Sequence, residues 1–342
     1  MSRENPSCVL VTGATGFLGA HVVDNLLARG ISVRGAARSM EKAQAMKDAR
    51  PQYASKLDFV QIGDIAQLGV FGDAIDGIDA VIHTASPLRY DTTDSEKELV
   101  LPAINGVKSI LAAASKPGSK VTRLVLTSSF AAVVDISKTP GSEFTYTASH
   151  WNPITYEEAT APGVDPVVAY RGSKKYAELE AWDFVQRENP GFDLVTLCPP
   201  MVFGPMVHPV NKVSEINESN STLWTVASGA DPLPPARVPA WVDVRDLAEA
   251  HVQALLTPEA GGRRYIPASP EQYSYELAAD IIKDNFEWAR GRVTTNYRSC
   301  KPSVTYRLDG ETVSRELGVE YRNFRGAVVD FVKQVRENIE GK

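Results

Sequence analysis

Residues 9–19 read VLVTGATGFLG and place Gly13, Gly16 and Gly19 between an apolar run and a stretch with helical periodicity. This placement is typical of the phosphate-binding turn in a dinucleotide-binding βαβ unit. The first glycine permits the tight turn, the second lets the backbone approach a pyrophosphate, and the third lets the helix pack close to the strand. The helix N-terminus offers free N–H groups to the anion. We predict pyrophosphate contacts from Gly13, Thr15, Gly16, Phe17, Leu18 and Gly19.

The first 200 or so residues repeat this alternation of a short apolar strand with an amphipathic helix. Strands are expected at 8–11, 31–37, 57–62, 80–83, 124–127 and 193–197, and helices at 17–29, 40–49, 102–114 and 169–188. Strands that alternate with helices build a parallel sheet with right-handed crossovers. The fold class is therefore predicted to be α/β, with a Rossmann-type doubly wound sheet.

The regular alternation stops after Cys198, where the chain becomes rich in proline. A helix is expected at 214–228, Rossmann-like elements return at 241–244 and 246–256, and a last helix is expected at 324–339. We predict a dinucleotide-binding Rossmann domain and a smaller α/β substrate lobe. The first comprises residues 1–198 and 241–257, and the second comprises residues 199–240 and 258–342.

The bulk composition argues against several classes of protein. Of the 342 residues, 43% are hydrophobic and 23% are charged, as in an ordinary globular protein. The net charge of −6 does not suggest the basic face that nucleic-acid binding requires. The chain has no apolar run of about 18 residues and no secretory signal, so no membrane span and a cytoplasmic location are expected. The cysteines, Cys8, Cys198 and Cys300, are widely spaced, which favours reduced thiols over a metal site.

The residues after the second expected strand indicate which dinucleotide fits. A carboxylate there would bind the ribose hydroxyls of NAD. This chain instead has Arg38 followed by Lys42. A guanidinium suits a 2′-phosphate because it donates two parallel hydrogen bonds, and an ammonium adds a point charge. We predict NADP(H), with Arg34, inside the strand, as the alternative contact.

Two further strand ends supply candidate cofactor contacts. Asp64 and Ile65 follow the third strand, where Asp64 is expected either to accept a hydrogen bond from an adenine or to cap a helix. The small residues Thr84, Ala85 and Ser86 follow the fourth strand and leave room for the cofactor. His83 is expected to be a packed histidine.

A Tyr-x-x-x-Lys pattern places lysine one helical turn after tyrosine, where an ammonium lowers the pKa of the phenol toward working pH. Tyrosine then serves as a general acid for carbonyl reduction. The pattern occurs at Tyr170/Lys174, near the start of a long expected helix, and at Tyr297/Lys301, where Pro302 discourages a helix. We select Tyr170 and Lys174.

A hydroxyl at the end of a neighbouring strand would complete the site by polarising the substrate carbonyl. Ser128 and Ser129 follow the fifth strand, and spacing alone does not decide which of them points inward. No Ser-His-acid order fits these residues, which argues against hydrolase chemistry.

Together, the motifs TGxxGFxG at 12–19, TSS at 127–129 and YxxxK at 170–174 resemble those of the extended short-chain dehydrogenase/reductases. The resemblance spans nearly the whole chain and is densest before residue 250. Segments similar to the fungal methylglyoxal/isovaleraldehyde reductase branch, a neighbour of the yeast carbonyl reductases and plant dihydroflavonol reductases, lie at 33–39, 83–87, 102–107, 151–153, 202–205 and 242–246.

The resemblance implies that Ser129, Tyr170 and Lys174 form a catalytic triad and that Arg38 and Lys42 hold the 2′-phosphate. It implies that Tyr170 and Lys174 also touch the nicotinamide ribose. Further cofactor contacts are implied at Pro199, Val202 and Ser219.

The expected substrate pocket departs from the family pattern. Positions where relatives often carry aromatic residues hold Leu88, Val134 and Met201 here, which predicts a pocket of different shape. Asn105 is expected either to order a proton-relay water or to pack as a helix amide.

We therefore expect an NADPH-dependent reductase of small-molecule aldehydes and ketones, acting as a monomer or homodimer without nucleic-acid or membrane partners. A dihydroflavonol-reductase-like or nucleotide-sugar-modifying enzyme is an alternative on the same scaffold. Nucleotide-sugar epimerases and dehydratases retain NAD, however, and Arg38 argues against that cofactor. A non-catalytic NADP-sensing regulator is an alternative of another class, against which the complete triad argues.

Overall fold

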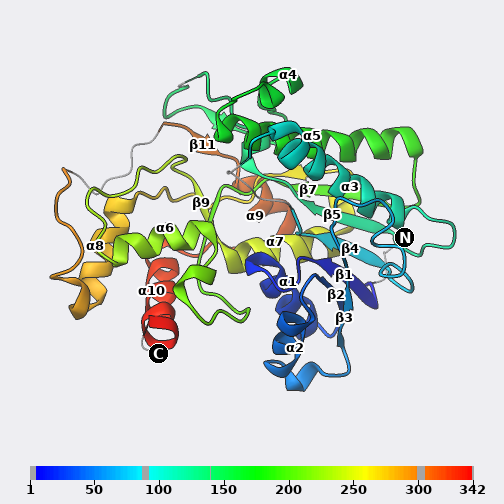
Figure 1. Cartoon of the computed structure of the whole chain (residues 1–342), viewed down its shortest axis with the longest axis horizontal. Coiled ribbons are helices and arrows are strands. Elements are labelled where there is room, and N and C mark those ends of the chain that lie inside the picture. Colours follow the sequence, from blue (N-terminus) through cyan, green and yellow to red (C-terminus); the bar gives the residue numbers. More distant parts are fainter. Residues whose placement is uncertain (1–4, 87–91, 139, 299–304, 341–342) are drawn as a thin grey trace.

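The computed structural model describes residues 5–86, 92–138, 140–298 and 305–340. A seven-stranded sheet with the order β10-β7-β5-β4-β1-β2-β3 forms its centre, and all of its pairings are parallel (Figure 1). The strands are β1 (Cys8–Thr12), β2 (Ser32–Ala37), β3 (Leu57–Gln61), β4 (Ala80–His83), β5 (Arg123–Thr127), β7 (Asp193–Leu197) and β10 (Arg264–Tyr265). The chain proceeds outward from β1 to β3, returns to β4 beside β1, and continues in the other direction. This reversal confirms the predicted doubly wound fold.

Alternate residues of each central strand face two different layers of helices, because side chains of a strand alternate between its faces. Val9 and Val11 pack with α1 (Phe17–Ala28), α2 (Met40–Asp48) and α7 (Val244–Leu256). Leu10 packs with α3 (Leu101–Ala114) and α5 (Pro166–Glu188). Figure 1 shows α3 and α5 on one side of the sheet, and α1, α2 and α7 on the other.

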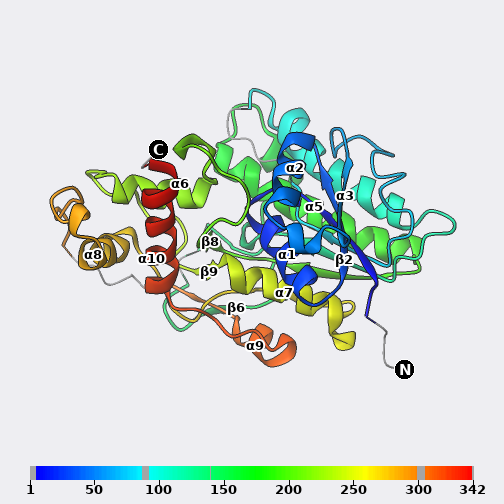
Figure 2. The ribbon, with the colours of Figure 1, turned by 90° about the horizontal axis from the view of Figure 1, so that it is seen from below.

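A second hydrophobic core lies beside the sheet. It contains side chains of α6 (Glu218–Ala227), α8 (Tyr275–Asn285) and α10 (Phe324–Val335). The ring of Trp241 packs at 5.0 Å from that of Phe324. Trp241 begins β9 (Trp241–Asp243), which pairs with β8 (Met201–Phe203). Figure 2 shows these three helices grouped at one end of the molecule, away from the sheet.

The predicted division into two domains is kept as a proposal. The second core draws mainly on residues after 199, as the predicted substrate lobe requires. However, β10 comes from the same C-terminal part and pairs with β7, which places it in the central sheet.

Several short elements were absent from the sequence-based expectation. They are α4 (Tyr156–Thr160), α8, α9 (Glu311–Leu317), and the two-residue strands β6 (Thr145–Tyr146), β10 and β11 (Arg307–Leu308). Within the described ranges, every helix is too short or too polar to cross a lipid bilayer.

The different burial of Leu26 and Leu68 predicts unequal effects on stability when each is changed to alanine. Leu26 of α1 is fully buried, whereas Leu68 is 72% exposed. Leu26→Ala is expected to lower the free energy of unfolding by about 2–5 kcal/mol because it leaves a cavity, while Leu68→Ala is expected to have almost no effect. Urea denaturation measures both values. Equal losses for the two variants would contradict the burial described here.

Candidate active site

The glycine turn lies at the carboxyl edge of the sheet, between β1 and α1. Gly13 has a φ of +66°, and a Cβ there would lie 2.8 Å from the Thr84 hydroxyl and 3.1 Å from the Ala85 nitrogen. A Cβ on Gly19 would collide with the Gly13 carbonyl oxygen. The first turn of α1 has no side-chain cap at Gly16, so its N–H groups are available to an anion. The turn therefore has the shape and polarity of a phosphate cradle.

The end of β4 packs directly against the end of β1. The Thr84 hydroxyl donates to the Thr12 carbonyl at 2.7 Å, and the Ala85 N–H donates to the Thr12 hydroxyl at 3.2 Å. His83 Nδ1 lies 2.9 Å from the same hydroxyl. Burial lowers the pKa of His83 to about 3, so this imidazole stays neutral. His83 is thus a packed histidine whose ring meets Phe71 edge-on.

The basic residues after β2 differ in their surroundings. Arg34 donates to the carbonyls of Ala74 at 3.1 Å and Asp76 at 2.6 Å, which commits its guanidinium to that loop. Arg38 and Lys42 are both exposed, and neither side chain has a hydrogen bond or ion pair to another described residue. These two cations are available to an anionic ligand.

Asp64 and Ile65 lie after β3 and have local partners. Asp64 Oδ1 accepts a hydrogen bond from the Ala66 N–H at 3.0 Å, which stabilises a turn rather than a helix. Ile65 packs against α3, where it lies 3.5 Å from the position of a Cβ on Gly106. Their proposed contact with adenine stays a prediction.

Ser129, Tyr170 and Lys174 come together at the same edge of the sheet. The Ser129 side chain lies close enough to the Tyr170 hydroxyl to lower the pKa of this phenol. The Lys174 ammonium donates to the Ser86 hydroxyl at 2.7 Å and lies 5.7 Å from the centre of the Tyr170 ring. The structure therefore joins four predicted residues from the ends of two strands and from one helix.

The pKa of Tyr170 differs from the expectation. Burial raises it, and this effect outweighs the hydrogen bond from Ser129, which lowers it. Burial also lowers the pKa of Lys174 to about 8, so its charge is itself disfavoured at this position. Tyr170 is therefore held as a neutral phenol at pH 7, the form that a proton donor needs.

The structure distinguishes the two adjacent serines. Ser129 lies in extended backbone, where successive side chains point in opposite directions. Ser128 is buried and donates to Glu178 Oε2 at 2.6 Å, away from Tyr170. The serine beside Tyr170 is Ser129, in agreement with the family resemblance.

The second Tyr-x-x-x-Lys pattern has a different environment. The Tyr297 hydroxyl donates to Asp280, and it accepts a hydrogen bond from Lys283 at 2.6 Å. Both partners belong to α8, far along the chain from the site residues. Lys301 lies outside the described residues.

The remaining predicted cofactor contacts lie on two neighbouring segments. The Pro199 carbonyl accepts a hydrogen bond from the Phe130 N–H at 2.9 Å, which places Pro199 beside Ser129. The Val202 carbonyl accepts from the Ser219 hydroxyl at 2.5 Å, which joins β8 to the start of α6.

The predicted substrate pocket is only partly described. Val134 is buried in a cluster with Phe130 and Tyr146. Met201 packs against the second core instead, so these two residues belong to different clusters. Leu88 lies outside the described residues.

Lys174 lines a small cavity of about 20 Å³, enough for one water molecule. Its polar lining includes Ser86, Ser128, Lys174 and Glu178. Glu178 was not predicted as a site residue. Its signal in the sequence is its position eight residues after Tyr170 and four after Lys174, on the same stripe of one helix.

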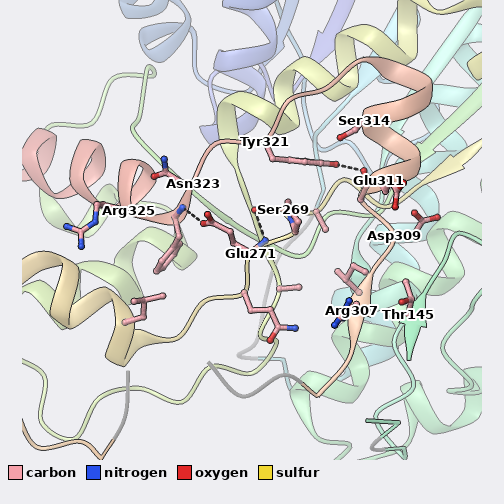
Figure 3. Close-up of a pocket in the computed structure, with 18 of the residues that line it drawn as sticks. Thr145, Ser269, Glu271, Arg307, Asp309, Glu311, Ser314, Tyr321, Asn323 and Arg325 are labelled. Atoms are coloured by element: carbon pink, nitrogen blue, oxygen red, sulfur yellow. Dashed lines mark hydrogen bonds between the residues drawn. The ribbon is translucent and has the colours of Figure 1, made fainter. Parts of the chain in front are cut away.

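A larger hollow of about 1080 Å³ opens elsewhere on the molecule (Figure 3). Residues around β11, α8 and the start of α10 line it, including Glu271, Arg307 and Tyr321. The Phe324 N–H, next to Asn323, donates a hydrogen bond to the Glu271 carboxylate at 2.8 Å, which Figure 3 marks with a dashed line. None of the predicted site residues lines this hollow.

The sheet, the glycine turn and the Ser-Tyr-Lys cluster define a Rossmann-fold protein with a polar site at the carboxyl edge of its strands. The model of the NAD dependent epimerase/dehydratase family matches residues 9–266. The chain belongs to this family.

Individual relatives cover almost the full length of the chain. An uncharacterized oxidoreductase of Schizosaccharomyces pombe is 35% identical over 97% of this chain and 98% of its own. The NADPH-dependent methylglyoxal reductase of Saccharomyces cerevisiae is 34% identical over 96% and 97%. A crystal structure of Gre2 from Candida albicans in complex with NADPH superposes with a TM-score of 0.89, at 32% identity, over 97% of this chain and 99% of that one.

The lowered pKa of Lys174 predicts a pH-dependent cost to stability. Its pKa is about 8 in the folded protein against a usual value of 10.5, so the folded state holds this proton less tightly than the unfolded state does. The charge therefore destabilises the fold at pH 7, and stability rises as the pH increases from about 8 toward 10.5. Lys174→Met is expected to melt at a higher temperature than the parent protein at pH 7, with a difference that narrows by pH 10. A difference that widens with pH would contradict this pKa.

Proposed function

We propose that this protein is an NADPH-dependent reductase that converts aldehydes or ketones to alcohols. The observation that carries the proposal is the cluster of Ser129, Tyr170 and Lys174 beside the glycine turn. This arrangement places a neutral phenol next to a hydroxyl and an ammonium at the edge where Rossmann folds bind nucleotides.

The residues present fit a phosphorylated dinucleotide. The tight shape of the turn requires glycine at positions 13 and 19, because Cβ atoms there would meet neighbouring atoms at short distance. The N–H groups of the first turn of α1, which have no side-chain cap at Gly16, suit a pyrophosphate. The side chains of Arg38 and Lys42 make no hydrogen bond or ion pair with another described residue, and they supply two positive charges for a 2′-phosphate. When bound, NADPH supplies the hydride for the reduction.

The protein residues then handle the oxygen and its proton. Tyr170 holds a proton on its hydroxyl and donates it to the carbonyl oxygen of the substrate. Ser129 donates a hydrogen bond to the same oxygen and so polarises the carbonyl before the proton arrives. Lys174 keeps a positive charge next to the phenol and stabilises the phenolate that remains after proton transfer.

Other features of the proposal rest on the sequence. The net charge of −6 favours a small-molecule substrate over nucleic acid. We propose a cytoplasmic enzyme that acts as a monomer or a homodimer.

The general-acid assignment is tested with Tyr170→Phe, which removes the hydroxyl and keeps the ring. Because general acid–base catalysis contributes about 10²–10⁴-fold, kcat is expected to fall by at least about 100-fold. NADPH oxidation is followed with aliphatic aldehydes, aryl ketones, 2-oxo esters and dihydroflavonols. Circular dichroism controls for folding, and near-parental turnover by the folded variant would refute the assignment.

The 2′-phosphate assignment is tested with two matched arginine variants. Arg38→Ala is expected to lower kcat/KM with NADPH by roughly 10- to 100-fold, the equivalent of a charged hydrogen bond of about 1.5–3 kcal/mol. Its kcat/KM with NADH is expected to stay unchanged. Arg34→Ala is the control, since that guanidinium is bound to the carbonyls of Ala74 and Asp76. An equal loss in both variants would assign the effect to general electrostatics.

A further inference from the structure

Helix α5 carries three polar side chains at intervals of four residues, Tyr170, Lys174 and Glu178. This spacing places them on one stripe of the helix, facing the sheet. The first two belong to the proposed site, and the third has no part in the chemistry described so far. Glu178 is only 1% exposed. Burying a carboxylate is costly unless its charge is paired, so the contacts that hold it require an explanation.

The Glu178 carboxylate joins α5 to three neighbouring strands. The Ser128 hydroxyl, just after β5, donates to Oε2 at 2.6 Å. The Thr196 hydroxyl, on β7, donates to Oε1 at 2.7 Å. Arg264, on β10, donates from Nε to Oε1 at 2.8 Å and from Nη2 to Oε2 at 3.1 Å. One side chain therefore fixes the helix relative to the β5, β7 and β10 side of the sheet.

The partner of Glu178 is itself held firmly. The Arg264 guanidinium stacks 3.8 Å from the centre of the Trp151 ring. It also donates to the carbonyls of Ala148 at 2.8 Å and His150 at 2.5 Å. Burial would raise the pKa of Glu178, but Arg264 and the hydroxyls that donate to it together hold the pKa below its usual value. The carboxylate therefore stays ionised, the state in which it accepts all of these hydrogen bonds.

Ser128 connects this network to the proposed site. It directly precedes Ser129, and the two hydroxyls point in opposite directions, one to Glu178 and the other to Tyr170. The Ser128 N–H also donates to the Leu197 carbonyl at 2.7 Å. A shift of the Ser128 side chain would thus move the hydroxyl of the next residue relative to α5.

We propose that Glu178, acting through Ser128, is a positioning residue that sets the geometry of Ser129 against Tyr170. This inference rests on the proposed function, since it concerns the same site. Glu178 touches neither substrate nor cofactor in this role.

The two hydroxyls on Glu178 supply a matched pair of variants. Ser128→Ala and Thr196→Val each delete one hydrogen bond of almost equal length to the same carboxylate. Only Ser128 is adjacent to Ser129. A purely structural network would respond alike to both changes, whereas a positioning role requires that only Ser128→Ala affects the site.

Steady-state kinetics with NADPH and the best carbonyl substrate form the first readout. Because small displacements of catalytic groups are costly, Ser128→Ala is expected to lower kcat by about tenfold, with the KM for NADPH changed by less than about twofold. Thr196→Val is expected to keep kcat within about twofold of the parent protein. Ser128→Cys, a variant of similar volume with a weaker donor, is expected to lie between them. Equal kcat losses in Ser128→Ala and Thr196→Val, or no loss in either, would overturn the proposal.

A second readout needs no cofactor. The protein is labelled with carbon-13 at the tyrosine Cζ, and the Tyr170 resonance is assigned by its absence from the Tyr170→Phe spectrum. Ser128→Ala is expected to shift this resonance, and Thr196→Val is expected to leave it in place. An unmoved resonance in Ser128→Ala would overturn the positioning role. If the resonance shifts as expected but no carbonyl supports NADPH oxidation, the proposed function fails and the positioning role stands.

Discussion

The parallel pairing of the central sheet is the constraint on which the candidate site depends. Because all seven strands run in the same direction, their carboxyl ends meet at one edge. The residues that follow β1, β4 and β5 are Gly13, Thr84 and Ser128. None of these segments is near the others in the sequence. Their proximity is a direct result of strand order, and the reversal between β1 and β4 opens the space at which nucleotides bind in such sheets.

Helix α5, which packs on one face of the sheet, supplies the other half of the site because its N-terminal part lies near this edge. Its N-terminal part carries Tyr170 and Lys174, and its middle part carries Glu178. Gly172 allows α5 to lie close to α4, since a Cβ at this position would collide with that of Ala159. The helix is therefore fixed on one side by close packing and on the other by a buried carboxylate. The rigid helix holds the Tyr170 phenol beside the Lys174 ammonium. Burial raises the pKa of Tyr170 and lowers the pKa of Lys174, so it disfavours the charged form of both groups.

Much of this arrangement is predictable from local patterns. Strands β1 to β5 and β7 read as apolar runs, and the glycine turn and the Tyr-x-x-x-Lys spacing need only neighbouring residues for their interpretation. The choice between Ser128 and Ser129 needed the family resemblance, because alternation alone does not say which face is inward. The cofactor contacts and the aliphatic pocket stay predictions, and Leu88 lies outside the described residues.

What escaped prediction depends on contacts between distant segments. The pairing of Glu178 with Arg264 joins residues 86 positions apart, and no periodicity links them. Strand β10 has two residues, too few to show alternation, and it forms because β7 offers an open edge. Helix α8 did carry a local signal, since Ser274 accepts a hydrogen bond from the Leu277 N–H as a cap. The expected lowering of the Tyr170 pKa failed because burial, which the sequence does not report, dominates.

A second buried arginine lies at the opposite end of the same strands. Arg123, at the start of β5, bonds Asp193 at the start of β7 at 2.6 and 2.9 Å and donates to the Thr257 and Pro258 carbonyls beyond α7. Strands β5 and β7 are therefore joined by a guanidinium–carboxylate pair at one end, and by the Ser128 and Thr196 hydroxyls, which share the Glu178 carboxylate, at the other. Sliding of one strand along the other would break charged contacts at each end at once.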